Sequence, residues 1–486
     1  MKVQTVTVSR RAWFILGILS STLLTVFFSE TMLLPAIPEI IKDFKIPYGT
    51  AAWIFSAYLI VAAVMTPVAG RLSDLYGKKK VLLTLLAIYM AGITAGGFAN
   101  SISFLLVTRI FQGVGLAAVP AAFSLLRDTF PPARLAMAIG VFGSAYSAGS
   151  VVGLLVGASI IQTFGWHATF LAIVPFAVLV SVMITKFVRE DKVLDQSAAQ
   201  ENSSSRERHS VSIDIKGILA LSSSITSFLV ALTLIQIGTS SEDLTLIAGA
   251  FAASAISLAV FVVLERKILP PFLDLRLLRH KILLPTYIMV IASGITMFMI
   301  YPTVVQLVRS PVPLGFGGDA VNAAHVQLPF MVMFLVFASI TPFIINKIGS
   351  IKPTIIGGSV SLIGGLGLLM FHTTELAVSL NLAVIASGLS LTMTAIWNVV
   401  VSSSPKEFTG ISVGVGALLL FIGMAIGPAL AGIYMANHEN LIGVGGSYPV
   451  PGSYSSVFLT AGLLSAVSLG FALLLRRGIT RREIEV

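Results

Sequence analysis

The sequence predicts an all-α membrane protein with fourteen transmembrane helices. Hydrophobic residues make up 56% of the chain and charged residues only 11%, whereas soluble domains average about 25% charged residues. Apolar stretches of about 20 residues recur along the chain, and each is long enough to cross a bilayer as a helix. The Lys and Arg residues behind the net charge of +10 lie in the short loops between these stretches. The positive charge therefore indicates membrane topology and not a nucleic-acid surface.

The first apolar stretch is predicted to be a retained helix and not a cleaved signal peptide. It is longer than a signal-peptide core, contains Glu30, leads into prolines and has no small-residue cleavage site. The predicted spans are, in order, 12–37, 51–70, 80–99, 103–125, 136–161, 167–188, 214–237, 244–264, 283–307, 323–346, 352–371, 376–402, 410–436 and 455–475.

The distribution of positive charge predicts the orientation. With both termini in the cytoplasm, all but four of the 31 Lys and Arg residues fall on the cytoplasmic side or in its loops. Lys42, Lys45 and Arg309 fall outside, and Arg109 falls within the membrane. The positive-inside rule therefore predicts a multi-pass protein of the cell membrane with cytoplasmic termini.

Two polar breaks divide the chain. We expect an N-terminal six-helix bundle (1–188), a cytoplasmic linker (189–213), two additional transmembrane helices (214–265), a cytoplasmic amphipathic linker (266–282) and a C-terminal six-helix bundle (283–486). Six-helix halves with a binding site between them are a recurrent transporter architecture.

Two opposite charges lie deep in predicted spans. Glu30 is the only ionisable residue of the stretch 12–37, and Arg109 lies about five residues below the outer end of its span, roughly 8 Å deep. A charged group inside a membrane helix is costly and usually belongs to an ion or substrate pathway. We expect the two side chains to pair, so that proton uptake by Glu30 releases Arg109. A permanent structural salt bridge is the alternative.

The loop 70–80, GRLSDLYGKKK, carries a recognisable pattern. Its glycines Gly70 and Gly77 suit a tight turn, and lysines from Lys78 onward hold the loop inside. The stretch resembles the cytoplasmic loop signature of the major facilitator superfamily, with Leu75 where an Arg is usual. The resemblance covers the whole chain and implies the major facilitator fold, here with two extra central helices.

In that family the loop aspartate helps to latch the two halves in the outward-facing state. The resemblance carries this role to Asp74, with Arg127 or Arg134 as its partner. A solvated turn aspartate is the alternative.

The span 103–125 contains TRIFQGVG at positions 108–115. It resembles the R-x-x-q-G motif of the family's proton-coupled exporters. Arg109 and Gln112 are three residues apart and share one helix face. Gly113 and Gly115 allow a neighbouring helix to approach closely.

The span 136–161 carries Gly149, Gly153 and Gly157 on one face, a pattern for close helix packing. It resembles the family's antiporter motif, except that Leu154 replaces a proline and Ala158 a glycine. We assign the three glycines to conformational change; packing alone would also explain them. Further resemblance to the fourteen-helix drug–proton antiporter branch comes from stretches 30–35, 165–175 and 265–276.

Polar and aromatic side chains near mid-membrane are candidates for the substrate site. These are Tyr58, Tyr146, Trp397 and Asn398, to which we add Glu30 and Gln112. Aromatic residues in such helices also serve as packing groups or interface anchors.

Catalysis is not expected. The G-x-S-x-G match at 410–414 opens an apolar helix instead of following a strand, and no Walker A loop is present. There is no cysteine, and the six histidines lack metal-ligand spacing. We therefore expect neither a metal nor a cofactor.

The predicted function is proton-coupled export of lipophilic small molecules, cationic ones among them, by alternating access. The expected partners are the substrate, protons and the lipid bilayer, with no nucleic acid, and the family expectation is a monomer. One alternative is a dedicated exporter or facilitator of a single endogenous metabolite or lipid. Another is a membrane scaffold or receptor that transports nothing.

Overall fold

A computed structural model describes residues 9–188, 215–237, 241–267, 280–404, 409–436, 438–440 and 447–484. The N-terminal half contains α1 (Arg10–Thr31), the 3-10 helix η1 (Leu34–Ala36), α2 (Ile37–Phe44), α3 (Tyr48–Tyr76), α4 (Lys78–Gly96), α5 (Ile102–Leu116), α6 (Ala118–Thr129), α7 (Pro132–Phe164) and α8 (His167–Phe187). Two helices follow, α10 (Ile215–Ile237) and α11 (Ser241–Lys267). The C-terminal half contains α12 (Leu283–Arg309), α13 (Ala320–Ile348), α14 (Ile351–Met370), α15 (Glu375–Ser403), α16 (Thr409–Met435), strands β1 (His438–Asn440) and β2 (Ser447–Pro449), and α17 (Pro451–Ile484).

Fourteen stretches among these residues are long and apolar enough to cross a membrane, which confirms the predicted number of spans. The predicted linker 189–213 and most of the predicted amphipathic segment 266–282 lie outside the described residues.

Two spans are not the single helices that the sequence predicted. The first breaks after Thr31, where α1 gives way to η1 and α2, because Pro35 and Pro38 have no N–H to donate to a continuing helix. The fourth breaks at Ala117, whose N–H bonds to the Val114 carbonyl, three residues back, at 3.2 Å. Both breaks lie within the N-terminal half.

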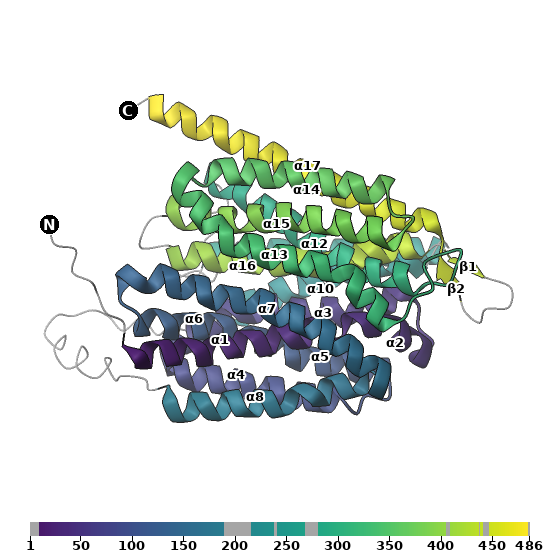
Figure 1. Ribbon diagram of the computed structural model, residues 1–486, viewed down its shortest axis with the longest axis horizontal. Helices are drawn as coiled ribbons and strands as arrows, with labels where there is room; N and C mark the ends of the chain where they lie inside the picture. The colour runs from purple at the N-terminus through teal and green to yellow at the C-terminus, as the bar shows by residue number, and fades with distance from the viewer. Residues whose placement is uncertain are drawn as a thin grey trace, which may run out of the picture.

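The two halves lie side by side with their helices along the long axis of the molecule (Figure 1). Helices α1 to α8 form one group and α12 to α17 the other, as predicted for two six-helix bundles. The halves meet where α3 packs on α16 and α7 packs on α13. We call the end of the bundle where α1 begins the inner end, following the predicted orientation, and the opposite end the outer end.

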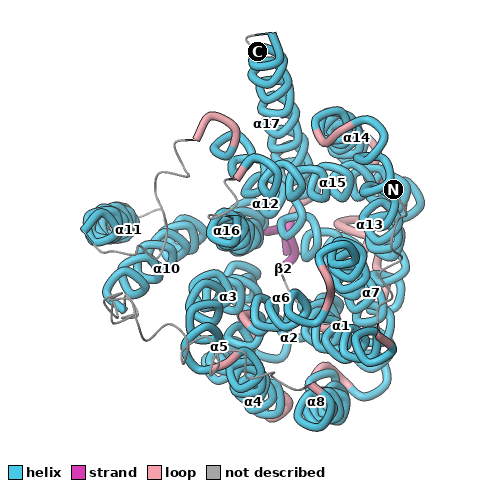
Figure 2. Tube along the Cα trace, turned by 90° about the vertical axis from the view of Figure 1, so that its left-hand side faces the viewer, coloured by secondary structure: helices cyan, strands magenta, loops and turns pink. Residues whose placement is uncertain are grey.

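The two additional helices lie at one side of the bundle (Figure 2). Helix α10 packs against both α3 and α16 and so covers the seam between the halves. The Trp53 indole donates a hydrogen bond to Thr233 of α10 at 2.8 Å. Helix α11 packs on α10, partly through reciprocal bonds of Ser224 and Ser254, and its remaining surface is apolar and exposed. Such a surface suits contact with lipid.

Glycines on one face of α7 allow backbone contact with a neighbouring helix, as their spacing predicted, and the structure shows that this helix is α1. A Cβ atom built on Gly149 would lie 2.6 Å from the Leu24 carbonyl oxygen, and one on Gly157 would lie 2.5 Å from the Met32 Cα. A Cβ on Gly153 would overlap the Phe28 carbonyl oxygen. Larger side chains at these positions would push α7 away from α1, the helix that carries Glu30.

The halves hold each other at the outer end. Arg309, the last residue of α12, forms an ion pair with Glu39 of α2, and its Nη1 donates to the Pro35 carbonyl at 3.3 Å. Gln162 of α7 donates to Asp319, which precedes α13, at 2.8 Å. These contacts close the outer end of the bundle.

Candidate functional site

Glu30 lies one residue before the end of α1 and is only 3% exposed. Both of its neighbours bind other helices. Thr31 donates to the Ser150 carbonyl of α7 at 2.9 Å, and Ser29 accepts from the Tyr89 hydroxyl of α4 at 2.5 Å. The carboxylate between them has no hydrogen-bond partner among the described residues. Hydrogen bonds to α4 and α7 thus hold the helix on both sides of Glu30, while the Glu30 carboxylate itself remains free to bind a proton.

Arg109 of α5 is completely buried. Its Nε donates to the Ile54 carbonyl of α3 at 2.9 Å, and its Nη1 donates to Gln112 Oε1 at 2.7 Å. The guanidinium carbon lies 4.4 Å from the centre of the Tyr58 ring, a cation–π geometry. Nη2 has no partner among the described residues. The predicted common face of Arg109 and Gln112 is therefore present, and the two side chains bind each other.

The glycines of the stretch 108–115 make room for the groups around Arg109. A Cβ on Gly113 would overlap the Tyr58 carbonyl oxygen, and a Cβ on Gly115 would lie 2.5 Å from the Tyr89 side chain. Gln112 also donates a long bond, 3.4 Å, to the Gly92 carbonyl of α4. The short motif thus builds a cradle in which α3, α4 and α5 surround one guanidinium group.

The direct ion pair expected between Glu30 and Arg109 is not formed in this structure. Their nitrogen and oxygen atoms do not come within 4.0 Å, although the two charges attract each other through space. The guanidinium instead donates hydrogen bonds to the Ile54 carbonyl and to Gln112, both of which lie closer to it than the Glu30 carboxylate does. Depth along the helices was predicted from sequence, but the lateral distance between helices was not.

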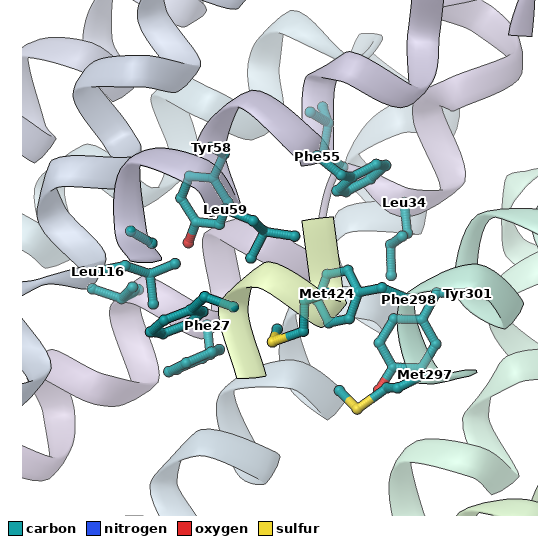
Figure 3. Packing of buried hydrophobic residues seen from close by; sticks show 14 of the residues in the cluster. Phe27, Leu34, Phe55, Tyr58, Leu59, Leu116, Met297, Phe298, Tyr301 and Met424 are labelled. Atoms are coloured by element: carbon teal, nitrogen blue, oxygen red, sulfur yellow. The ribbon is translucent and has the colours of Figure 1, made fainter. Parts of the chain in front are cut away.

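Four tyrosines lie within electrostatic range of Glu30. Tyr58 and Tyr146 were predicted as site residues, whereas Tyr89 of α4 and Tyr301 of α12 were missed. Figure 3 shows Tyr301 from the C-terminal half with Phe298 beside it, and Phe27 with Tyr58 from the N-terminal half. A tyrosine in the middle of an apolar span is the sequence signal that would have identified the two missed residues.

Aromatic rings connect the halves at the level of Glu30. The ring centres of Phe27 and Tyr146 are 4.1 Å apart, and those of Tyr146 and Phe334 of α13 are 6.3 Å apart. Within the C-terminal half, Tyr301 of α12 and Phe330 of α13 pack edge to face at 5.1 Å. Of the predicted substrate residues, Tyr146 is thus the one that contacts the opposite half through its ring.

Trp397 and Asn398 lie elsewhere than predicted. They occur in the last two turns of α15, so that Asn398 is about 8 Å from the inner end of that helix and not at mid-membrane. Asn398 is exposed and accepts a hydrogen bond from Ser350 at 2.7 Å, while Trp397 packs over Gly416. Both residues lie within five residues of the inner end of the predicted span 376–402, so this position could have been read from the sequence.

The predicted turn is confined to Gly77, because residues 70–76 continue α3 and α4 begins at Lys78, so the prediction that Gly70 belongs to the turn is wrong. Gly77 joins α3 to α4 with a φ of 95°, a conformation that favours glycine, and Gly70 has open space around it. Lys78 forms an ion pair with Asp128 at the end of α6. Arg127 and Arg134 are exposed.

The side chain of Asp74 lies outside the described residues. No group of three or more His, Cys, Asp or Glu side chains able to hold a metal occurs in the described part of the chain.

Comparison with known proteins places this architecture in a family. Residues 19–428 match the family model described as Major Facilitator Superfamily. The chain is 27% identical over 438 residues to the tetracenomycin C resistance and export protein of Streptomyces glaucescens, covering 88% of this chain and 76% of that protein. It is 27% identical over 444 residues to the multidrug transporter protein MdtP of Bacillus subtilis, covering 89% and 77%.

A third relative is the multidrug efflux pump LfrA of Mycolicibacterium smegmatis, 25% identical over 439 residues, with 89% of this chain and 83% of that protein covered. Among solved structures, the human organic anion transporter MFSD10 superposes with a TM-score of 0.63 at 15% identity, covering 96% of this chain and 99% of that one. The POT family transporter PepTSo superposes with a TM-score of 0.64 at 15% identity, covering 96% and 98%. These two likenesses concern the fold.

The family match extends from the first predicted span into the thirteenth, and it includes the loop signature, Glu30 and the cradle of Arg109. The chain belongs to the Major Facilitator Superfamily and is a multi-pass membrane transporter of its fourteen-helix branch.

Proposed function

We propose that the protein exports lipophilic small molecules, cationic ones among them, in exchange for protons. The observation that carries this proposal is the buried carboxylate of Glu30, which has no hydrogen-bond partner and lies within electrostatic range of the buried Arg109. A structural acid in an apolar interior is normally paired, because an unpaired buried charge is costly. A carboxyl group that takes up and releases a proton during transport must not be held in a permanent hydrogen bond or ion pair.

Alternating access supplies the cycle. With a proton on Glu30, the attraction between Glu30 and Arg109 is lost, and the balance between two arrangements of the helices can change. The membrane potential adds ~2.3 kcal/mol per charge per 100 mV, which is more than a tenfold bias for one net charge. The proton gradient can therefore drive the movement of substrate against its own gradient.

The substrate would lie between the halves near Glu30 and Tyr146. Tyr146 packs between Phe27 and Phe334, so that separation of the halves would expose aromatic faces beside an acid. Such a surface suits a flat apolar molecule, with or without a positive charge. Trp397 and Asn398 would meet the substrate only near the inner end. The names of the relatives, which include multidrug transporters and an antibiotic export protein, support this substrate class.

The moving parts would be the loop 70–80 and the contact between α1 and α7. We propose that Asp74 pairs with Arg127 or Arg134 when the protein opens outward, and that Gly149, Gly153 and Gly157 let α7 move against α1 without side chains in the way. The protein would work in the cell membrane as a monomer with both termini in the cytoplasm.

A dedicated exporter or facilitator of one endogenous metabolite or lipid is the second candidate. The departures from the antiporter motif favour it, since Leu154 and Ala158 replace the usual proline and glycine and are both buried. A ligand panel separates the two: transport of many unrelated ligands supports the multidrug exporter, and transport of a single one supports the dedicated exporter.

The first experiment uses purified protein in liposomes that contain a pH-sensitive dye. An imposed proton gradient and added lipophilic cations should produce proton movement that depends on substrate, and Glu30→Gln should abolish it. Glu39→Gln is the matched control, because that carboxylate lies at the outer end and bonds to Arg309. Unchanged coupling in a folded Glu30→Gln protein would remove Glu30 from the mechanism.

A further inference from the structure

One turn of α3 holds Arg109 from two sides. The carbonyl of Ile54 accepts a bond from Nε, and the ring of Tyr58, one turn later, lies against the guanidinium. The ring of Phe55 is farther away, with its centre 6.0 Å from the guanidinium carbon. Between them, Ser56 donates to the Ala425 carbonyl of α16 at 2.8 Å. The same turn thus contacts both the buried arginine and the opposite half.

The hydroxyl of Tyr58 is the unexplained group in this turn. The side chain is fully buried, and its oxygen has no hydrogen-bond partner among the described residues. A buried hydroxyl without a partner is costly and calls for an explanation. Tyr58 interacts through space with both Glu30 and Arg109, whose carboxylate and Nη2 also lack partners. Three unsatisfied groups with complementary hydrogen-bonding capacity therefore occur in one buried region.

The other ionisable groups around Glu30 are engaged or lie farther away. Tyr89 of α4 bonds to Ser29, Tyr146 of α7 packs on Phe27, and Tyr301 belongs to α12 across the interface between the halves. Helices α6 and α8 also pack on α1, but their charged and histidine side chains lie near the helix ends. Among the described residues, Tyr58 combines contact with Arg109 and a hydroxyl that is available for Glu30.

We propose that Tyr58 is a positioning residue that connects Glu30 to Arg109. Its ring holds the guanidinium, and its hydroxyl donates a hydrogen bond to the ionised Glu30 carboxylate in the part of the cycle in which α1 and α3 approach. The proton that is transported binds Glu30, and Tyr58 keeps its own proton throughout. Proton uptake weakens this bond and frees α3, which carries the change to α16 through Ser56. This inference rests on the proposed role of Glu30.

The test is an infrared pH titration of the Glu30 carboxyl group, which does not require transport. The C=O band of the protonated acid is assigned by its loss in Glu30→Gln. In Tyr58→Phe, which keeps the ring and the shape, the midpoint of the titration should move to higher pH by about one unit, because the ionised form loses a donor. Tyr287→Phe is the control, since Tyr287 is a buried tyrosine of the other half that bonds to the Ser412 carbonyl.

A titration of Tyr58→Phe that matches wild type would overturn the inference. If no carboxyl band is lost in Glu30→Gln at any pH, Glu30 does not titrate, and the inference fails together with the role of Glu30. Transport adds a second measurement in Tyr58→Leu, which also removes the ring. The ratio of uphill transport to substrate exchange at equal pH should fall at least tenfold, whereas a parallel loss of both activities would indicate a merely structural role for Tyr58.

Discussion

The two halves of the molecule use the same packing for different chemistry. In each half the first and fifth helices touch through glycines: α7 on α1 in the N-terminal half, and α16 on α12 in the C-terminal half. A Cβ built on Gly423 would lie 2.5 Å from the Ile291 carbonyl oxygen, and one on Gly427 would lie 2.7 Å from that of Ile295. Only in the N-terminal half does this pair of helices enclose an acid.

The charges of the two halves differ accordingly. In the described part of the C-terminal half, each Asp, Glu, Lys and Arg lies within about one turn of the end of a membrane span or outside it. The N-terminal half buries both Glu30 and Arg109 at depth. The shared glycine packing gives both halves close contacts between helices. Among the described residues of the two halves, buried charges, which are costly in a membrane, occur only in the N-terminal half, where we place proton binding. The C-terminal half offers aromatic and neutral polar groups such as Tyr301 and Gln327.

The largest effect should come from removing a buried charge. We expect Arg109→Gln to reduce uphill transport on the order of 100-fold, because it leaves the buried Glu30 without a compensating charge. Gln327→Leu removes a buried polar group of the C-terminal half that bonds only weakly, at 3.4 Å, to the Tyr301 carbonyl, and it should leave proton coupling intact. Both variants are compared by their uphill transport in liposomes under a fixed pH gradient. Equal losses of transport in the two variants would mean that both halves take part in proton coupling.

The shared packing predicts matched losses of stability in the two halves. Gly153→Ala and Gly427→Ala should each destabilise the protein by about 1–3 kcal/mol, since the added methyl group meets backbone of the neighbouring helix. Gly143→Ala and Gly414→Ala are the controls. A Cβ at either position meets nothing within 4 Å, so these changes should be neutral or slightly stabilising. Thermal unfolding in detergent compares the four variants, and a loss confined to one half would contradict the common packing.

The smallest effect should come from the ion pair that joins the halves. Arg309→Glu places two like charges at the closed outer end, where the residues are partly exposed. We expect a two- to fivefold faster reaction of a cysteine at Ile37 with an impermeant maleimide, because such pairs contribute about 0.2–1 kcal/mol. Wild type contains no cysteine, so the reporter has no background. The double variant Glu39→Arg with Arg309→Glu should restore the slow rate; if it stays fast, the ion pair is not what closes this end.

The sequence by itself determined the number of spans, the two groups of six and the glycine face through which α7 packs closely on another helix. These features follow from local quantities: the length of apolar runs, the cost of burying charge, and glycine spacing along one helix face. It also identified Glu30, Arg109 and Gln112 as unusual residues, because a polar side chain in an apolar span is visible without any knowledge of its neighbours.

Only the tertiary structure decided what those residues touch. The sequence predicted an ion pair from matching depth, yet Arg109 binds the Ile54 carbonyl and the Tyr58 ring, because lateral distances depend on how helices pack. The same holds for Tyr301, which reaches the region of Glu30 from the other half. An apolar run fixes that a helix crosses the membrane, whereas the register and rotation that bring distant side chains together are set by contacts between helices.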